Sequence, residues 1–296
     1  MLRIIGFPII NKVGIYYAYW THDWDADFVP YIYKVKKLGF DVLEINAGTI
    51  ATLGADEKKR LKDAAAEMGI NMSCCIGLPS SSDLASSDIA VRQAGINHLH
   101  HIGDAMVECG IDRLSGIIYS NWPGSFEVRG VTKQQAWDWS VASMKEAIKK
   151  AEDLDLIYNV EVVNRFEQFL MNTAAEGVAY VKEVGSPNLK ILLDTFHMNI
   201  EEDTIGGAIE TAGEYLGHLH TGESNRKPPG YGHIPWDEIG ASLKKLDFQG
   251  WVVMEPFLMP GGEVGRDIRV YRCLMPDADL DEEARKACAF TKAFLK

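Results

Sequence analysis

Four side chains that can bind a metal ion close the last four strand-like segments of the chain. Each ends a short apolar run, and in order they are Glu161, Asp194, His220 and Glu255. An ionisable group at the end of a buried strand is costly unless it is paired or binds a metal. Three carboxylates and one imidazole in succession therefore predict a divalent-cation site. Such an oxygen-rich set favours Mn²⁺, Mg²⁺ or Co²⁺ over an ion that prefers thiolate ligands.

Further polar side chains follow three of these segments. Glu167 comes six residues after Glu161, and His197 and Arg226 follow the second and third segments in the same way. Side chains in loops that leave the strands face the same end of the sheet as the strand-end groups. The sequence therefore predicts one site on which several ionisable groups converge.

The composition is typical of a soluble enzyme that acts on small neutral molecules. The chain has 296 residues, which suits a single α/β barrel, and 47% of them are apolar, which is enough for a large core. The net charge of −12 argues against binding to nucleic acid or to an anionic membrane, because both require basic patches. No apolar run approaches the ~18 residues needed to span a bilayer. Five cysteines without CxxC spacing predict reduced thiols and a cytoplasmic location.

Strand-like runs alternate with amphipathic stretches along the chain, which is the pattern of a parallel sheet. The expected strands are 14–19, 42–46, 71–76, 113–118, 158–163, 189–194, 216–220 and 251–255. The expected helices are 26–38, 55–67, 89–109, 133–154, 173–184, 204–214, 235–246 and 281–294. Eight of each predict an α/β fold of the (β/α)8 TIM-barrel type. Residues 13–296 would form one catalytic domain, preceded by an N-terminal arm of residues 1–12.

A TIM barrel accounts for the placement of the candidate ligands. In this fold the active site lies at the carboxyl ends of the strands, which is where all four ligands fall. The loops 221–234 and 256–271 follow the last two expected strands and are rich in Gly, Pro and charge. Loops of this length at a barrel mouth are more often functional lids than connectors.

The polar segments have a specific counterpart in a known family. At Glu161–Glu167, Leu193–Asn199, His218–Arg226 and Met254–Phe257 the chain resembles the D-tagatose 3-epimerase / D-psicose (D-allulose) 3-epimerase family of ketose 3-epimerases. The resemblance extends from Val13 over essentially the whole chain. It implies a xylose-isomerase-like barrel that binds one divalent cation per subunit, Mn²⁺ or Co²⁺. It also implies epimerisation at C3 of free ketohexoses, D-fructose with D-allulose or D-tagatose with D-sorbose, by a homodimer or homotetramer.

The resemblance implies roles for individual residues as well. The family's metal ligands match Glu161, Asp194, His220 and Glu255, and its substrate-holding residues match Glu167, His197 and Arg226. Epimerisation removes a proton on one face of the sugar and returns it on the other, which suits two carboxylates. We assign this proton transfer to Glu161 and Glu255. The apolar walls against the C–H faces of the sugar would be Tyr16, Trp24, Trp122 and Phe257.

Other residues near these motifs have more than one interpretation. His218 shares a strand face with His220 and competes for the ligand role, since side chains two apart point the same way. The family motif selects His220, so His218 is expected to be a hydrogen-bonded residue of the barrel interior. Glu44 is expected either to contact the site or to orient a ligand. Ile117 and Asn121 depart from the family pattern and are expected to alter the distal end of the pocket.

A cluster of three histidines, His98, His100 and His101, resembles a metal site in composition. It falls within an expected helix, far from the strand ends. These side chains are therefore expected at the surface or in an interface.

Three other functions are possible alternatives for a barrel with these residues. An aldose–ketose isomerase could use a similar metal site, and differs in moving hydrogen between C1 and C2. A non-catalytic sugar-binding barrel would not need two carboxylates placed for proton transfer. A metal-dependent nuclease would need more histidine ligands and a basic face, which the net charge of −12 opposes.

Overall fold

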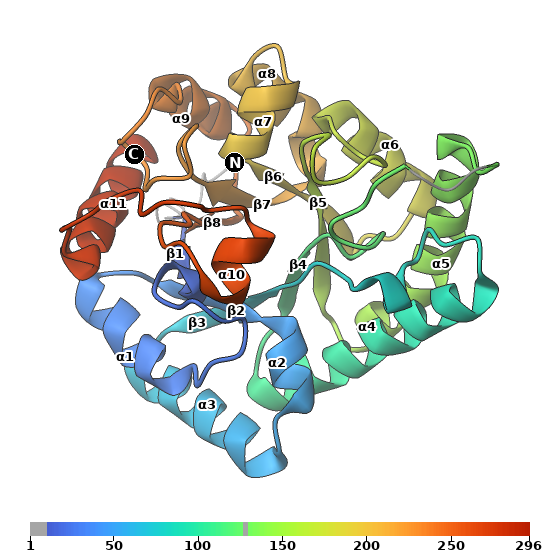
Figure 1. Ribbon diagram of the computed structural model, residues 1–296, viewed down its shortest axis with the longest axis horizontal. Helices are drawn as coiled ribbons and strands as arrows, with labels where there is room; N and C mark the ends of the chain where they lie inside the picture. Colours follow the sequence, from blue (N-terminus) through green and yellow to red (C-terminus); the bar gives the residue numbers. More distant parts are fainter. Residues whose placement is uncertain (1–10, 127–129) are drawn as a thin grey trace, which may run out of the picture.

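The computed structural model describes residues 11–126 and 130–296, in which the predicted strands close into one barrel (Figure 1). The strands are β1 (Val13–Tyr16), β2 (Val42–Asn46), β3 (Asn71–Cys75), β4 (Arg113–Gly116), β5 (Ile157–Val162), β6 (Leu189–Asp194), β7 (Leu216–Thr221) and β8 (Trp251–Met254). Neighbouring strands pair in parallel in sequence order, and β8 returns to pair with β1. The α/β fold of the (β/α)8 TIM-barrel type is therefore confirmed.

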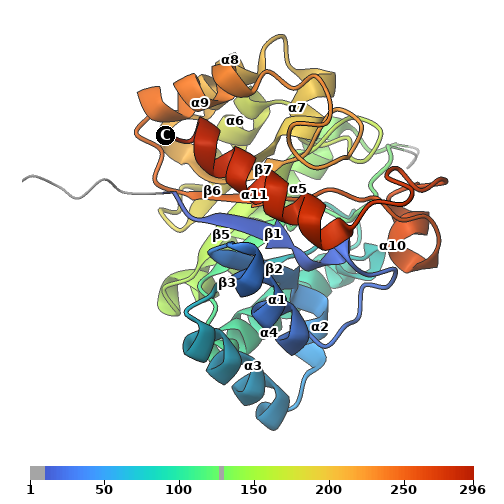
Figure 2. The ribbon, with the colours of Figure 1, turned by 90° about the vertical axis from the view of Figure 1, so that its left-hand side faces the viewer.

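The helices lie around the strands, most of them in an outer ring, with α10 over the middle of the barrel (Figure 1). They are α1 (Val29–Leu38), α2 (Ala47–Thr52), α3 (Ala55–Met68), α4 (Ile89–Cys109), α5 (Lys133–Asp153), α6 (Ala174–Val184), α7 (Thr195–Glu201), α8 (Ile205–Ala212), α9 (Trp236–Lys245), α10 (Gly262–Asp267) and α11 (Leu280–Phe294). Three of these were not predicted, namely α2, α7 and α10. Each follows the carboxyl end of a strand, so the three short helices lie at the barrel mouth, with α10 beyond the strand ends in Figure 2.

Local sequence signals account for several helix boundaries. Thr132 and Gln135 form a capping box at the start of α5, in which each side chain accepts from the other residue's backbone N–H. At α7 the cap is Asp194 itself, whose carboxylate accepts from Phe196 N at 2.7 Å. The predicted start of α1 at residue 26 was three residues early. Pro30 lies in its first turn, where a proline is favoured, and the helix begins at Val29.

The first strand is also shorter than predicted. It ends at Tyr16, and Tyr17–Tyr19 form a 3-10 turn that directs the chain across the mouth. β4 similarly ends at Gly116 rather than at residue 118. These early strand ends release the chain into the loops that surround the site.

Several buried polar side chains lie inside the barrel below the mouth, whereas the main apolar core lies between strands and helices. Fully buried polar side chains inside the barrel come from several strands and include Glu44, Ser73, Ser115, Asn159 and His218. Some of their contacts span the barrel. Glu44 is on β2 and bonds to His220 on β7, although β1 and β8 separate these two strands in the sheet.

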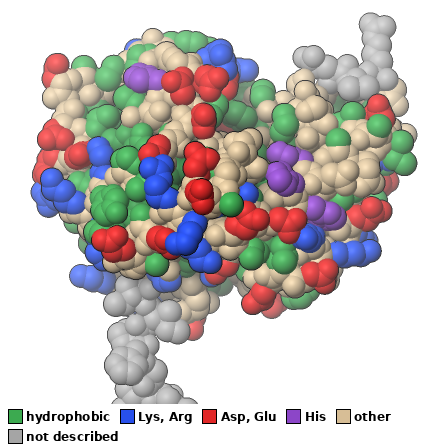
Figure 3. All heavy atoms as spheres, turned by 90° about the horizontal axis from the view of Figure 1, so that it is seen from below, with side chains coloured by type: hydrophobic (Ala, Val, Ile, Leu, Met, Phe, Trp, Pro, Cys, Tyr) green, Lys and Arg blue, Asp and Glu red, His purple; other side chains and the backbone are tan. Residues whose placement is uncertain are grey.

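The predicted N-terminal arm, residues 1–12, lies outside the described residues except for Asn11 and Lys12. Asn11 Nδ2 donates to the carbonyl oxygen of Phe248 at 2.8 Å, and Lys12 Nζ donates to Asn71 Oδ1 at 2.8 Å. Across the described part of the chain, none of the helices is long and apolar enough to cross a membrane. On the face drawn in Figure 3, acidic and basic side chains are intermixed.

Candidate active site

The four predicted metal ligands meet at the barrel mouth. Glu161 is on β5, Asp194 ends β6, His220 is on β7, and Glu255 directly follows β8. One ligand atom from each lies within 4.8 Å of the others. All four side chains are buried. The prediction that these strand-end groups converge is thus confirmed, and the arrangement is a candidate metal centre.

Negative charge accumulates in this centre. Burial first, and then the charge of Glu255, raise the pKa of Glu161 well above its usual value. Burial also acts to raise the pKa of Asp194, but His197 and Arg226 outweigh it and hold that pKa below its usual value. Arg226 Nη1 lies 3.2 Å from Asp194 Oδ2 and 3.5 Å from Glu255 Oε2. Three buried carboxylates exceed what one guanidinium neutralises, so a divalent cation fits this donor set.

The imidazole of His220 has one ring nitrogen available for a cation. Its Nε2 lies 2.7 Å from Glu44 Oε1, and Ser73 Oγ donates to the other Glu44 oxygen at 2.7 Å. A carboxylate only accepts hydrogen bonds, so Nε2 carries the proton. His220 Nδ1 is then the ring nitrogen left for a cation. It has no hydrogen-bond partner in the described structure and lies 3.6 Å from Glu255 Oε2. Such an unpartnered buried nitrogen beside carboxylates is what a metal ligand requires.

His218 is buried in the barrel interior beside Glu44, as predicted for its burial. Its Nε2 lies 3.3 Å from Glu44 Oε2, yet neither ring nitrogen makes a hydrogen bond within residues 11–126 and 130–296. His218 is not part of the candidate metal centre.

The predicted substrate-holding residues form a second group beside the metal centre. His197 Nε2 lies 3.7 Å from Glu161 Oε1, and Arg226 Nη2 lies 3.7 Å from Glu167 Oε1. His197 belongs to α7 rather than to a loop. Asn164, which the sequence analysis missed, donates from Nδ2 to His197 Nδ1 at 2.7 Å. His197 therefore carries its proton on Nε2, the nitrogen that faces the carboxylates and the pocket.

Arg226 is held by its backbone as well as by its charge. Its φ of 62° is in the left-handed region, which is unfavourable for a residue with a side chain. Backbone bonds hold this conformation, since Arg226 N donates to Glu223 O at 2.9 Å and Phe257 N donates to Arg226 O at 3.1 Å. The guanidinium lies over the Phe196 ring, 4.0 Å from its centroid. Its planar fork is thus fixed before any ligand arrives.

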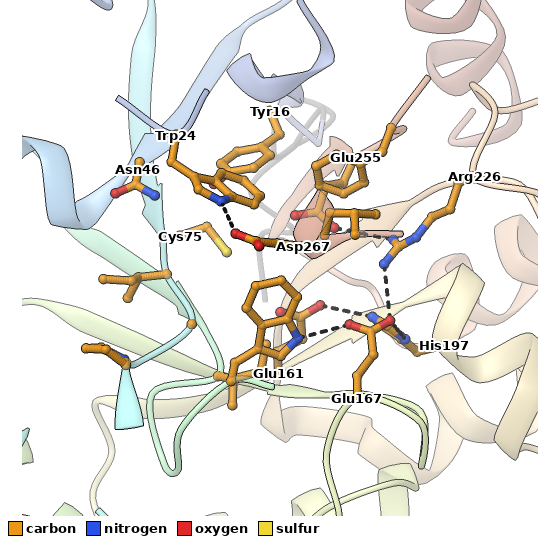
Figure 4. Close-up of a pocket in the computed structure, with 17 residues that line it drawn as sticks. Tyr16, Trp24, Asn46, Cys75, Glu161, Glu167, His197, Arg226, Glu255 and Asp267 are labelled. Atoms are coloured by element: carbon orange, nitrogen blue, oxygen red, sulfur yellow. Dashed lines mark hydrogen bonds and ion pairs between the residues drawn. The ribbon is translucent and has the colours of Figure 1, made fainter. Parts of the chain in front are cut away.

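A pocket of about 310 Å³ opens onto these groups (Figure 4). This volume is at the small end of the range for ligand pockets, so the pocket fits a small molecule. All four predicted apolar walls line it, namely Tyr16, Trp24, Trp122 and Phe257. So do Glu161, Glu255 and the three predicted substrate-holding residues, Glu167, His197 and Arg226, whereas Asp194 and His220 lie beneath the pocket surface.

The pocket also has walls that the sequence analysis did not assign. Asn46, Cys75 and Asp267 line it, and no spacing in the sequence relates them to the four motifs. Ile117 lines the pocket as predicted. Asn121 does not line it, because its backbone N–H bonds to Asp83 and its side chain bonds to the carbonyl oxygen of Pro123.

The three clustered histidines lie on α4, away from the pocket. His101 Nε2 lies 2.9 Å from the carbonyl oxygen of Ala51, which joins α4 to α2. His101 is exposed, and His98 is half-buried. The cluster is not part of the candidate metal centre.

Comparison with known proteins agrees with the fold. Residues 32–292 match the family described as xylose isomerase-like TIM barrel, so the chain is a member of this class of barrels. The D-psicose 3-epimerase of Agrobacterium fabrum is 45% identical over 96% of this chain and 99% of that protein. The D-psicose 3-epimerase of Ruminiclostridium cellulolyticum is 45% identical over 96% of this chain and 98% of that protein.

Among solved structures, a D-psicose 3-epimerase with D-tagatose from Clostridium cellulolyticum H10 superposes with a TM-score of 0.94. It is 45% identical, over 96% of this chain and 99% of that one. The chain therefore belongs to the ketose 3-epimerase family, and it is an isomerase of the epimerase type.

Proposed function

We propose that this epimerase is metal-dependent and interconverts free ketohexoses at C3. The first pair is D-fructose and D-allulose, and the second is D-tagatose and D-sorbose. The observation that carries the proposal is the pair of carboxylates, Glu161 and Glu255, which belong to one candidate metal centre and also line one pocket. A binding protein would not need two such groups beside the same ligand.

The cation would be held by Glu161, Asp194, His220 and Glu255. We propose Mn²⁺ or Co²⁺, with Mg²⁺ also compatible with the ligand types. When bound, the cation supplies positive charge for the negative charge that develops on the sugar oxygens as the C3 proton leaves.

Glu161 and Glu255 would exchange the C3 proton. One removes it from one face of the sugar to give an enediolate, and the other returns a proton to the opposite face. They come from β5 and β8, which are three strands apart around the barrel, so they can flank a sugar lying between them. The variants Glu161→Gln and Glu255→Gln test whether these two residues act as a catalytic pair.

Glu167, His197 and Arg226 would hold the sugar through O1 and O2. His197 Nε2 and the guanidinium are donors fixed by neighbouring side chains, so they can steady charge on the carbonyl oxygen without rearranging. The aromatic walls Tyr16, Trp24, Trp122 and Phe257 would contact the C–H faces. From the family resemblance we further propose a homodimer or homotetramer located in the cytoplasm.

The test of the reaction is incubation of the Mn²⁺-loaded protein with D-fructose in D₂O, followed by NMR of the sugars. D-Allulose with deuterium at C3 is the expected product. An aldose product with deuterium at C1 or C2 would instead identify an aldose–ketose isomerase. If D-fructose is unchanged, D-tagatose is the next substrate, and no turnover of either sugar would refute the proposal.

The two carboxylates are tested by Glu161→Gln and Glu255→Gln. Each substitution removes the charge that accepts the proton, so turnover should fall by at least about 10³-fold. Metal content is measured for each variant, because both residues are proposed ligands. Glu210→Gln, on the exposed surface of α8, is the matched control. Near-normal turnover in either metal-loaded active-site variant would make the two-carboxylate assignment wrong.

A further inference from the structure

Two tryptophans line the pocket, and each donates its indole N–H to a carboxylate. Trp122 Nε1 donates to Glu167 Oε2 at 3.0 Å, and Trp24 Nε1 donates to Asp267 Oδ2 at 2.9 Å (Figure 4). The two indole rings are 6.5 Å apart and nearly perpendicular. Glu167 was already placed among the substrate-holding residues, whereas Asp267 belongs to neither the metal centre nor the sugar-holding group.

Asp267 ends α10, the short helix that follows β8 and lies over the barrel mouth (Figures 1 and 2). Its other oxygen, Oδ1, accepts from Arg266 Nε at 2.8 Å. Arg266 is exposed, so this bond ties the carboxylate to the helix surface and leaves Oδ2 for the indole. The side chain of Asp267 thus reaches inward from α10 and lines the pocket beside Trp24.

The backbone around Trp24 is also joined to α10. Val264 N donates to the carbonyl oxygen of His22 at 2.9 Å, and Trp24 N donates to Glu263 Oε2 at 3.3 Å. On its other side the segment is held by the barrel, since Tyr17 Oη and Thr49 Oγ1 both donate to the carbonyl oxygen of Trp24. The backbone position of Trp24 is therefore determined by several bonds. The indole itself makes a side-chain hydrogen bond to Asp267 and packs against Trp122 and Phe257.

We propose that Asp267 is a positioning residue that sets which part of the Trp24 indole borders the sugar site. With its N–H bonded to Asp267, the indole packs edge-on against Phe257, with centroids 6.3 Å apart and planes at 74°. The indole then offers the sugar apolar contact rather than a free donor. Without Asp267 the indole would turn to satisfy its N–H elsewhere, and the apolar wall would be lost. This inference rests on the proposed function, because it assumes that a ketose occupies the pocket.

The consequence is an effect on substrate binding more than on chemistry. Trp24 lines the pocket but belongs to neither the candidate metal centre nor the proposed proton-transfer pair, so its orientation should affect how the sugar is held and not the proton transfer. Removing the acceptor with Asp267→Leu, which has a similar shape, should raise KM for D-fructose about tenfold and change kcat by less than about twofold. Asp267→Asn keeps an oxygen acceptor for the indole N–H and should lose less.

A double-mutant cycle with Trp24→Phe tests whether the effect passes through the indole N–H. The side chain of phenylalanine has no N–H. In the Trp24→Phe background, Asp267→Leu should therefore cause no further rise in KM beyond the rise that Trp24→Phe causes alone. The same fold increase in both backgrounds would overturn the inference. So would a fall in kcat at unchanged KM, because that result would assign Asp267 to the chemistry.

Hydrogen–deuterium exchange provides a readout that does not depend on turnover. In the full-length protein, Asp267→Leu should speed amide exchange in residues 262–267 and 22–24. In the Trp24→Phe background, the same substitution should cause no further increase in the exchange rate. An equal increase in both backgrounds would overturn the inference. If the wild-type protein turns over no ketose, the proposed function fails, and the exchange cycle still decides whether Asp267 positions Trp24.

Discussion

At the scale of single residues, the candidate metal centre depends on which nitrogen of His220 faces the cation. Glu44 decides this, because its carboxylate accepts the Nε2 proton at 2.7 Å across the barrel. Burial acts to raise the pKa of Glu44, but His220 and His218 outweigh it and hold that pKa well below its usual value. The carboxylate is therefore ionised and remains an acceptor. A carboxylate–histidine pair of this kind fixes the ring and makes it a better donor to the metal.

We predict that Glu44→Leu weakens Mn²⁺ binding by about 10–100-fold, because His220 loses the partner that orients it. Glu44→Gln retains an oxygen acceptor and should lose less affinity. Equilibrium dialysis measures the dissociation constant directly, and circular dichroism checks that each variant folds. Ser73→Ala is the control, since it removes one bond to Glu44 and leaves the bond to His220. An unchanged Mn²⁺ affinity in folded Glu44→Leu would contradict this role.

At the scale of elements, the ends of the strands determine where the loops turn toward the site. β4 stops at Gly116, whose φ of +113° is in a region that other residues rarely adopt. A Cβ at this position would overlap the carbonyl oxygen of Ile76, which follows β3. Both the conformation and the close approach of two backbones therefore require glycine. The strand pattern predicted continuation to residue 118 because Ile117 and Ile118 are β-branched, but the tight turn overrides that preference.

We predict that Gly116→Ala lowers the melting temperature by about 6–10 °C, since it combines left-handed strain with a clash against backbone that cannot move aside. Gly39→Ala is the matched control. Its φ is +90°, but a Cβ there has no neighbour within 4 Å, so only the conformational strain remains. That variant should lose about 2–4 °C. Differential scanning calorimetry compares the two, and equal losses would show that the contact with Ile76 is unimportant.

At the scale of the whole molecule, the candidate metal centre joins the carboxyl ends of four consecutive strands, β5 to β8. Half of the barrel therefore meets at one group of buried charges. Without a cation, three carboxylates repel one another at this junction, with Arg226 nearby as partial compensation. A cation bound at this centre should therefore stabilise the barrel.

We predict that Mn²⁺ at about 100 times its dissociation constant stabilises the fold by about 2.7 kcal/mol, which raises the melting temperature by about 5–10 °C. Addition of EDTA should reverse the shift. Asp194→Asn removes a proposed ligand and should abolish the response, whereas Asp203→Asn, at an exposed site beyond α7, should preserve it. If saturating Mn²⁺ left the melting temperature of the wild-type protein unchanged, the four-strand metal junction would be refuted.

The sequence by itself determined the barrel and the region of its candidate metal centre. Alternating strand and helix patterns are local signals, and parallel strands place their carboxyl ends at one edge, so Glu161, Asp194 and Glu255 had to converge with a histidine of the seventh strand. The same argument located Glu167, His197 and Arg226 at the mouth, because each follows a strand end within a few residues. The choice of His220 over His218 came from the family resemblance.

Only the tertiary structure decided which partners orient those groups. Trp24 and Asp267 are separated by 243 positions, and Glu44 and His220 by 176. Such contacts exist because the barrel closes and α10 folds back over its mouth. Neither feature can be predicted from a local sequence pattern. Packing between distant elements also decided the left-handed backbone of Arg226 and the position of Asn121 outside the pocket lining. Local periodicity specifies elements and their ends, whereas contacts between distant residues depend on how those elements pack.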